Sequence, residues 1–92
     1  MLDIQFSRDA QKFLQKLSQK KHLRQIKDAL GRLRENPYPH DSQSLHGDLK
    51  NRSRIDVGEY RIIYHIEDNT LKISLVGKRN DSDVYRRAKR KK

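Results

Sequence analysis

The fold is decided by residues 55–77, which read IDVGEYRIIYHIEDNTLKISLVG. Apolar and polar residues alternate through most of this stretch, and short polar breaks at Gly58-Glu59 and at Glu67-Asp68-Asn69 interrupt the alternation. A period of two residues is typical of half-buried strands, and glycine, aspartate and asparagine at such breaks favour tight turns. The stretch therefore predicts a three-stranded antiparallel meander, with one face packed against the rest of the protein and the other face open.

The alternation also predicts which side chains share a face, because successive residues of a strand point to opposite sides. We expect a buried face made of Ile55, Val57, Tyr60, Ile62, Tyr64, Ile66, Leu71, Ile73 and Leu75. The open face is expected to hold Arg52, Arg54, Asp56, Arg61, Ile63, His65, Lys72, Ser74 and Val76.

Upstream of the meander the pattern changes twice. Residues 2–6 alternate like a short strand, and Ser7 stands where a helix N-cap is expected. Helical spacing then places apolar residues in two stripes: Ala10, Phe13, Leu14 and Leu17, followed by Leu23, Ile26, Leu30 and Leu33. Gly31 interrupts the second helix, which we interpret as a position of close packing, and Asn36-Pro37-Tyr38-Pro39 ends it. Residues 37–50 are expected to form a loop.

Together these elements predict an α+β fold: an N-terminal strand, a helical hairpin and a three-stranded antiparallel meander, with room for a short C-terminal helix from about Ser82. The 92 residues are expected to form a single domain, residues 1–92, that ends in a basic tail, residues 86–92.

The composition excludes several classes of protein. The chain has no cysteine, which excludes a disulfide scaffold, a thiol nucleophile and a cysteine-ligated zinc site. No apolar run approaches the roughly 18 residues of a membrane span, and the N-terminus lacks the basic and apolar regions of a signal peptide. We therefore expect a cytoplasmic protein without a membrane partner. Only 33% of the residues are hydrophobic, so we expect a thin core and marginal stability without a partner.

Basic residues dominate the charge, with 22 Lys and Arg against 12 Asp and Glu and a formal net charge of +10. Six of the basic residues lie in residues 86–92, a tail that we expect to act as an electrostatic arm for polyanions. Residues 50–85 carry seven basic and six acidic residues, but the meander sorts their arginines onto one face.

A candidate anion site follows from that sorting. It consists of Arg52, Arg54 and Arg61 on the open face, Lys78 and Arg79 after the last strand, and Tyr85 further on. Like charges brought together without a partner destabilise a fold, so their convergence favours an anionic ligand. Guanidinium groups donate paired hydrogen bonds to phosphate, and an aromatic ring offers a surface for an unstacked base. These features predict a site for single-stranded RNA or DNA.

The chain resembles the RelE branch of the RelE/ParE toxins of prokaryotic toxin–antitoxin modules in three motifs: Gly58-Glu59-Tyr60-Arg61-Ile62-Ile63-Tyr64, Val76-Gly77-Lys78-Arg79 and Asp83-Val84-Tyr85. The resemblance covers essentially the whole chain up to Tyr85, including the Leu45-His46-Gly47 loop. It implies a ribosome-dependent endoribonuclease, or mRNA interferase, that cleaves mRNA in the ribosomal A site, inhibits translation and is silenced by a cognate RelB-like antitoxin.

Position by position, the resemblance implies catalytic roles for five residues. Arg61 matches the arginine that contacts the scissile phosphate, and Arg79 matches the arginine that stabilises the phosphate or the leaving group. Tyr85 matches the tyrosine that stacks on or orients the substrate. Arg52 and Arg54 stand where the best-studied RelE-type enzyme has two lysines. Because arginine does not lose its proton, the identity of a general base stays open.

The histidines and the remaining cations complete the predicted site. His46 and His65 are open candidates for proton transfer, whereas His22 and His40 are expected on the surface. We assign substrate binding to Lys50, Lys78, His46 and His65, and binding of ribosomal RNA to Arg86, Arg87, Lys89 and Arg90. No histidine pair has the spacing of zinc ligands and no acidic cluster suits magnesium, so we expect no metal or other cofactor.

Two other functions remain compatible with the sequence. A ParE-like toxin poisons DNA gyrase by protein contact without nuclease activity, and relatives of that kind generally lack the clustered arginines and the terminal tyrosine. A non-enzymatic RNA-binding module uses the same basic face and tail without chemistry.

Overall fold

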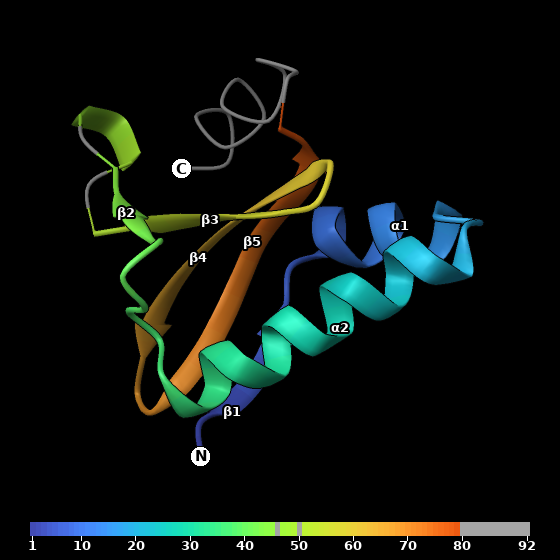
Figure 1. The fold of residues 1–92 in the computed structure, drawn as a ribbon. Helices are drawn as coiled ribbons and strands as arrows, with labels where there is room; N and C mark the ends of the chain where they lie inside the picture. The colour runs from blue at the N-terminus through green and yellow to red at the C-terminus, as the bar shows by residue number, and fades with distance from the viewer. Residues whose placement is uncertain (46, 50, 80–92) are drawn as a thin grey trace.

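Over residues 1–45, 47–49 and 51–79, which the computed structural model describes, the chain forms a five-stranded sheet with two helices on one face (Figure 1). The elements follow in the order β1 (Asp3–Phe6), α1 (Arg8–Lys16), α2 (Lys20–Glu35), β2 (Gln43–Ser44), the 3₁₀ helix η1 (Gly47–Leu49), β3 (Ser53–Val57), β4 (Tyr60–Glu67) and β5 (Thr70–Lys78). Across the sheet the order is β1-β5-β4-β3-β2, and β1 lies parallel to β5 while the other neighbours are antiparallel. We call the side of the sheet away from α1 and α2 the far face.

The predicted meander is confirmed, and its turns have the expected backbone. Asp68 and Asn69 adopt positive φ angles of 53° and 60°, as a two-residue type I′ hairpin requires. Gly58 has a φ of 58° in the turn between β3 and β4, and a Cβ there would lie 3.0 Å from Oε1 of Gln25 on α2. The backbone angle therefore favours glycine at this turn, and a larger residue would also displace the end of the Gln25 side chain.

Ser7 caps α1 as predicted and also ties that helix to the sheet. Its hydroxyl accepts a hydrogen bond from the Ala10 amide at 3.0 Å and donates one to the Ser74 carbonyl at 2.5 Å. A capping residue of this kind contributes about 0.5–2 kcal/mol to stability. The second bond fixes the start of α1 over the middle of β5.

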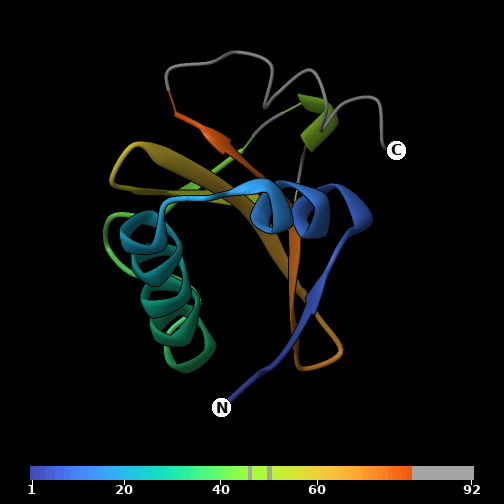
Figure 2. The same ribbon diagram turned by 90° about the vertical axis from the view of Figure 1, so that its right-hand side faces the viewer.

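The main core lies between the helical hairpin and the sheet, and Figure 2 shows both helices on one side with β1 beside β5. Ile26 and Leu33 of α2 are fully buried in it, and the hydroxyl of the buried Tyr64 donates to the Pro37 carbonyl at 2.6 Å. Gly31 is exposed, and apart from its chain neighbours and the adjacent helix backbone no atom lies within 4 Å of the place where its Cβ would stand. The expectation of close packing at Gly31 is therefore wrong.

A β-bulge in β5 changes the predicted faces. Residues 63 and 64 of β4 pair with Leu75 and Ile73, so Ser74 is an extra residue in the ladder. Strict alternation put Leu75 among the helix-facing residues and Val76 on the opposite face. The structure does the reverse, with Val76 in the main core and Leu75 on the far face, because one extra residue shifts the parity of every residue after it.

The prediction of an open far face is wrong for its centre. Leu49 of η1 packs there with Ile63 and Leu75, all three are at most 3% exposed, and Leu45 packs against them. Both β2 and η1 lie within residues 37–50, which were predicted as loop. This segment therefore adds an edge strand and a small second core to the sheet.

The predicted C-terminal helix and the basic tail lie outside the described residues. Within the described ranges, no helix is long and apolar enough to cross a lipid bilayer.

Candidate functional site

On the far face, three neighbouring strands place side chains in rungs that run across β3, β4 and β5. The first rung is Asp56, Arg61 and Gly77, the second is Arg54, Ile63 and Leu75, and the third contains His65 and Lys72. Residues opposite each other in a ladder share a face and lie within reach of each other. Ile63 and Leu75 belong to the small core with Leu49, so apolar side chains separate the first rung from the third.

Arg61 and Asp56 are bonded across the first rung. Nε of Arg61 donates to Oδ1 of Asp56 at 2.6 Å, and Nη2 donates to Oδ2 at 3.1 Å. The Arg61 side chain is 14% exposed and the Asp56 side chain is 39% exposed. A two-bond contact of this kind fixes the plane of the guanidinium group as well as its position. On β5, Arg61 faces Gly77, which has no side chain.

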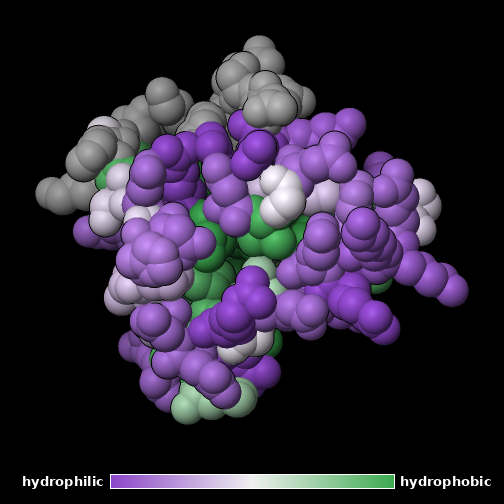
Figure 3. All heavy atoms as spheres, in the orientation of Figure 1, coloured by the Kyte–Doolittle hydropathy of each residue, from purple (hydrophilic) through white to green (hydrophobic). Residues whose placement is uncertain are grey.

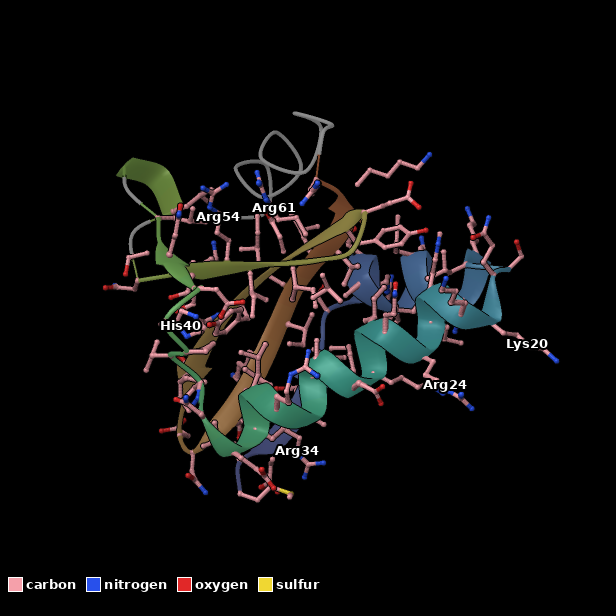
Figure 4. The ribbon with its side chains drawn as sticks, viewed as in Figure 1. Lys20, Arg24, Arg34, His40, Arg54 and Arg61 are labelled. Carbon is pink, nitrogen blue, oxygen red and sulfur yellow. The ribbon has the colours of Figure 1, made fainter. Side chains whose placement is uncertain are left out.

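Arg54 is held in a similar way from β2. Its Nε and Nη2 both donate to Oε1 of Gln43, with 3.1 Å for the Nε bond, and the two residues are cross-strand partners. Figure 4 shows Arg54 and Arg61 on the far face, away from α2. A neighbouring strand thus fixes each of the two arginines.

The charges of three arginines act on the Asp56 carboxylate, and one of these arginines, Arg61, is bonded to it. The hydrogen bond from Arg61 is the largest cause of an Asp56 pKa below its ordinary value, and burial opposes that shift. The positive charges of Arg61, Arg54 and Arg79 lower the pKa further. The Arg79 amide donates to the Glu59 carbonyl at 3.0 Å, which ties the end of β5 to the turn between β3 and β4. We call Arg54, Arg61 and Arg79 the arginine cluster.

Arg52 lies apart from the arginine cluster, beside the third rung. Burial is the largest cause of a lowered pKa at His65, and the positive charge of Arg52 lowers it further. Lys72 also lowers it, whereas Glu67, which is ion-paired with Lys72 at 2.5 Å, raises it. His65 is roughly 13 Å from Arg61 along β4, at about 3.3 Å per residue. His65 and its neighbour Arg52 therefore lie toward the other end of the far face from the Asp56–Arg61 pair.

The remaining predicted residues are either on the other face or outside the described residues. Lys78 pairs with Tyr60, a member of the main core, so the register puts Lys78 on the helix-facing side. Its substrate contact stays a prediction that this register does not favour. Tyr85, Lys50 and His46 lie outside the described residues, as do Arg86, Arg87, Lys89 and Arg90.

His22, which we expected on the surface, is in contact with the core. Its Nδ1 lies 2.7 Å from the hydroxyl oxygen of Tyr60, and its Nε2 lies 3.4 Å from a carboxylate oxygen of Glu59. The histidine thus links the start of α2 to the turn between β3 and β4. His40, by contrast, is exposed as predicted.

Sequence reasoning missed Asp56 and Gln43 as parts of the site. Asp56 could have been found from the sequence, because the two-residue turn at Gly58-Glu59 sets the register and makes Asp56 the cross-strand partner of Arg61. Gln43 lies in a segment without alternation, and no local pattern indicates that it joins the sheet.

A groove of about 340 Å³ runs between α2 and β3, next to the arginine cluster. Asp28 and Arg32 of α2 line one side, and Ile55, Asp56 and Val57 of β3 line the other. Figure 3 shows hydrophobic residues in this hollow with hydrophilic residues around them. Among residues 1–45, 47–49 and 51–79, no group of three or more histidine, aspartate or glutamate side chains could hold a metal ion.

The family model of the ParE toxin of type II toxin–antitoxin systems, parDE, matches residues 4–82, which is most of the chain. This chain belongs to the RelE/ParE superfamily of toxins. It is a toxin of a type II toxin–antitoxin module. No curated protein sequence matches it.

Solved structures similar to this toxin belong to the RelE-like branch of the superfamily. The isolated RelE toxin of E. coli has a TM-score of 0.74 at 26% identity, covering 96% of this chain and 95% of that chain. A RelBE toxin–antitoxin complex from Mycobacterium tuberculosis has a TM-score of 0.73 at 28% identity, covering 87% and 93%. The archaeal RelE–RelB complex from Pyrococcus horikoshii has a TM-score of 0.72 at 27% identity, covering 85% and 94%.

Proposed function

We propose that this toxin is a ribosome-dependent endoribonuclease, an mRNA interferase that cleaves mRNA in the ribosomal A site and thereby inhibits translation in the cytoplasm. The reaction is the attack of a ribose 2′-hydroxyl on the adjacent phosphorus, without a metal or another cofactor. The observation that carries the proposal is the arginine cluster, in which Arg54, Arg61 and Arg79 act on one carboxylate of the far face.

The arginine cluster suits the charge that develops in this reaction. As the 2′-oxygen bonds to phosphorus, the bond from phosphorus to the 5′-oxygen breaks, and the products are a 2′,3′-cyclic phosphate and a 5′-hydroxyl. Negative charge builds on the phosphoryl oxygens, and each fixed donor aimed at them contributes about 10²–10³ in rate. Arg61 and Arg54 are already held by Asp56 and Gln43, so they reorganise little when a phosphate arrives.

Solvent transfers the protons in this proposal. The 2′-hydroxyl loses a proton and the leaving 5′-oxygen gains one. Arginine does not accept a proton, the Asp56 pKa is lowered, and His65 is roughly 13 Å from Arg61 along β4. We expect a pH–rate profile without a basic limb near neutrality, and a clear pKa between 5 and 8 would implicate His46 or His65 instead.

The ribosome is the first proposed partner because it presents the mRNA. A strand held in the decoding site arrives in a fixed shape, and in-line positioning of its 2′-hydroxyl contributes part of the acceleration. We assign Tyr85 to stacking on a base of that strand. Binding of ribosomal RNA is assigned to the tail residues Arg86, Arg87, Lys89 and Arg90.

A cognate antitoxin of the RelB-like type is the second proposed partner. The similar structures from Mycobacterium tuberculosis and Pyrococcus horikoshii are complexes of a toxin with its antitoxin. An acidic segment over the arginine cluster would block the site and add stability at the same time. A neutralising complex that leaves Arg61 and Arg79 accessible, without displacing the C-terminal segment, would contradict this direct occlusion.

Expression in a translating extract, with mRNA ends mapped by primer extension, tests the nuclease proposal. We expect the wild type to cut within codons and the variants Arg61→Ala and Arg79→Ala to lose these cuts. Arg24→Ala is the matched control, because Arg24 is exposed on α2 and points away from the cluster (Figure 4). Intact mRNA with the wild type would overturn the proposal.

Gyrase poisoning is the second candidate, because the matching family model is that of the ParE toxin. It predicts intact mRNA together with stalled replication. A non-enzymatic RNA-binding module predicts RNA binding with neither effect. Measurements of mRNA ends, replication and RNA binding on the wild type and the same variants therefore separate the three functions.

A further inference from the structure

The charges of the arginine cluster act on a carboxylate that the proposed reaction does not use. Asp56 is the cross-strand partner of Arg61, and its two carboxylate oxygens accept from that guanidinium group at 2.6 Å and 3.1 Å. The charges of Arg54 and Arg79 also act on this carboxylate. A negative side chain in a phosphate site repels the ligand, so the presence of Asp56 beside Arg61 needs an explanation.

A role in proton transfer does not explain why Asp56 lies beside Arg61. Both of its carboxylate oxygens accept hydrogen bonds from Arg61, which stabilise the charged form and make the carboxylate a weaker base. A general base also works best with a pKa near the operating pH. The surrounding guanidinium groups hold the Asp56 pKa below its ordinary value, which is the wrong direction for a base at neutral pH.

The contacts of Asp56 fit a role in orienting the Arg61 side chain. Gly77, the β5 partner of Arg61, has no side chain that restricts the arginine. Asp56 binds the Nε and Nη2 atoms, so a residue of β3 sets the plane of the guanidinium group. A phosphate that approaches the cluster then meets a guanidinium group whose plane is fixed before the phosphate arrives.

We propose that Asp56 is a positioning residue, which holds the Arg61 guanidinium group in the plane required for phosphodiester cleavage and whose charge keeps simple anions from binding tightly. The inference rests on the proposed nuclease function. Removal of the charge then has two opposite effects. Anions bind more tightly because a repulsion is removed, and cleavage slows because Arg61 loses its alignment.

The variants Asp56→Asn and Asp56→Glu separate charge from geometry. Asparagine keeps the size of the side chain but removes its charge and one of the two acceptors, whereas glutamate keeps the charge and shifts the carboxylate by one methylene. Glu67→Gln is the matched control, because Glu67 is ion-paired with Lys72 at the other end of β4. Each variant is assayed for kcat and KM on mRNA-programmed ribosomes, and for the inhibition constant of inorganic phosphate.

For Asp56→Asn we expect kcat to fall about tenfold, the effect of removing one bond to a charged group. The phosphate inhibition constant should fall about fivefold, the effect of one unit charge at 4 Å in water. Asp56→Glu should keep the wild-type inhibition constant and still lower kcat. Glu67→Gln should change neither quantity.

An unchanged kcat in Asp56→Asn would overturn the proposal, and so would phosphate binding that weakens together with cleavage. A basic limb in the pH–rate profile of the wild type that disappears in Asp56→Asn would make Asp56 a general base instead. If the wild type cleaves no mRNA, the proposed function fails separately. A phosphate titration followed through the Arg61 Nε–H resonance then decides the positioning role, because equal phosphate affinity in wild type and Asp56→Asn overturns it.

Discussion

Basic residues gather in two regions of this toxin, the far face of the sheet and the outer side of the helical hairpin, and the regions differ in what holds the side chains. Residues 10–27 contain six basic residues and no acidic residue. All six are exposed, and none forms an ion pair with another described residue: Lys12, Lys16, Lys20, Lys21, Arg24 and Lys27. In the arginine cluster, Arg54 is bonded to Gln43 and Arg61 to Asp56.

The number of charges is therefore a poor guide to the site. Exposed lysines lose side-chain freedom when they bind a ligand, and water and salt screen their attraction. An arginine already fixed by a neighbouring strand keeps its position, so its charge acts on one phosphate in a defined geometry. The helical hairpin has more basic residues, whereas Arg54 and Arg61 of the far face are held by hydrogen bonds to neighbouring strands.

The largest expected difference between the regions comes from a substitution that keeps the charge. Arg61→Lys should lower the single-turnover rate of mRNA cleavage by about 10², because a lysine cannot replace the two-pronged guanidinium group. Arg24→Lys on the hairpin should leave that rate unchanged. Equal rates for Arg61→Lys and the wild type would mean that charge alone matters in the cluster.

The support from β2 should have the next largest effect. Gln43→Ala removes the side chain that bonds Arg54, and we expect about a tenfold lower cleavage rate, since a hydrogen bond to a charged group contributes about 1.5–3 kcal/mol. Gln15→Ala on α1 is the matched control, because Gln15 is exposed and far along the chain from the cluster. A full rate in Gln43→Ala would show that Arg54 is positioned without β2.

The hairpin should affect salt dependence more than chemistry. The triple variant Lys20→Gln, Arg24→Gln, Lys27→Gln should bind single-stranded RNA with a logarithmic salt slope that is smaller by about 0.7 for each phosphate that it no longer binds. Its cleavage rate at saturating ribosome concentration should equal that of the wild type. The measurement is RNA affinity at several salt concentrations, and a lowered saturating rate would contradict the comparison.

The smallest expected effect concerns pH and the third rung of the far face. The pKa of His65 is lowered from 6.5 in the folded state, so both states are uncharged at this residue well above pH 6.5 and the stability is fully present there. As the pH falls below 6.5, the unfolded chain takes up the proton first and stability is lost. Urea unfolding between pH 7.5 and 5 should show this loss in the wild type and less of it in His65→Gln. An identical pH dependence in the two proteins would contradict it.

Alternation in residues 55–77 was sufficient for the meander and its turns, because both depend on neighbours in sequence. The bulge at Ser74 was not predictable in this way. Leu75 and Val76 are both apolar, so either residue satisfies the alternation, and the packing of Leu49 against the far face decides between them. β2 and η1 depend on the same long-range contact.

The candidate site was only partly predictable from sequence. Strand parity puts Arg54 and Arg61 on one face, and it puts Asp56 there too, but parity does not say which side chains of a face bond to each other. Parity also puts Arg52 on that face, but it does not predict which side chains Arg52 lies beside. The structure places Arg52 near His65. The face of a residue is a local property, whereas its neighbours depend on register.

The parallel pairing of β1 with β5 sets the order in which the molecule can fold. Asp3 pairs with Thr70 and Phe6 with Ile73, so the first strand to be synthesised has no partner until the last strand of the sheet has been made. Contacts of such long sequence separation form slowly. Arg79 directly follows β5, so the arginine cluster is assembled only after β5 has been synthesised. The nascent sheet is therefore incomplete until β5 has been made, and a binding partner already present can meet it before the site exists.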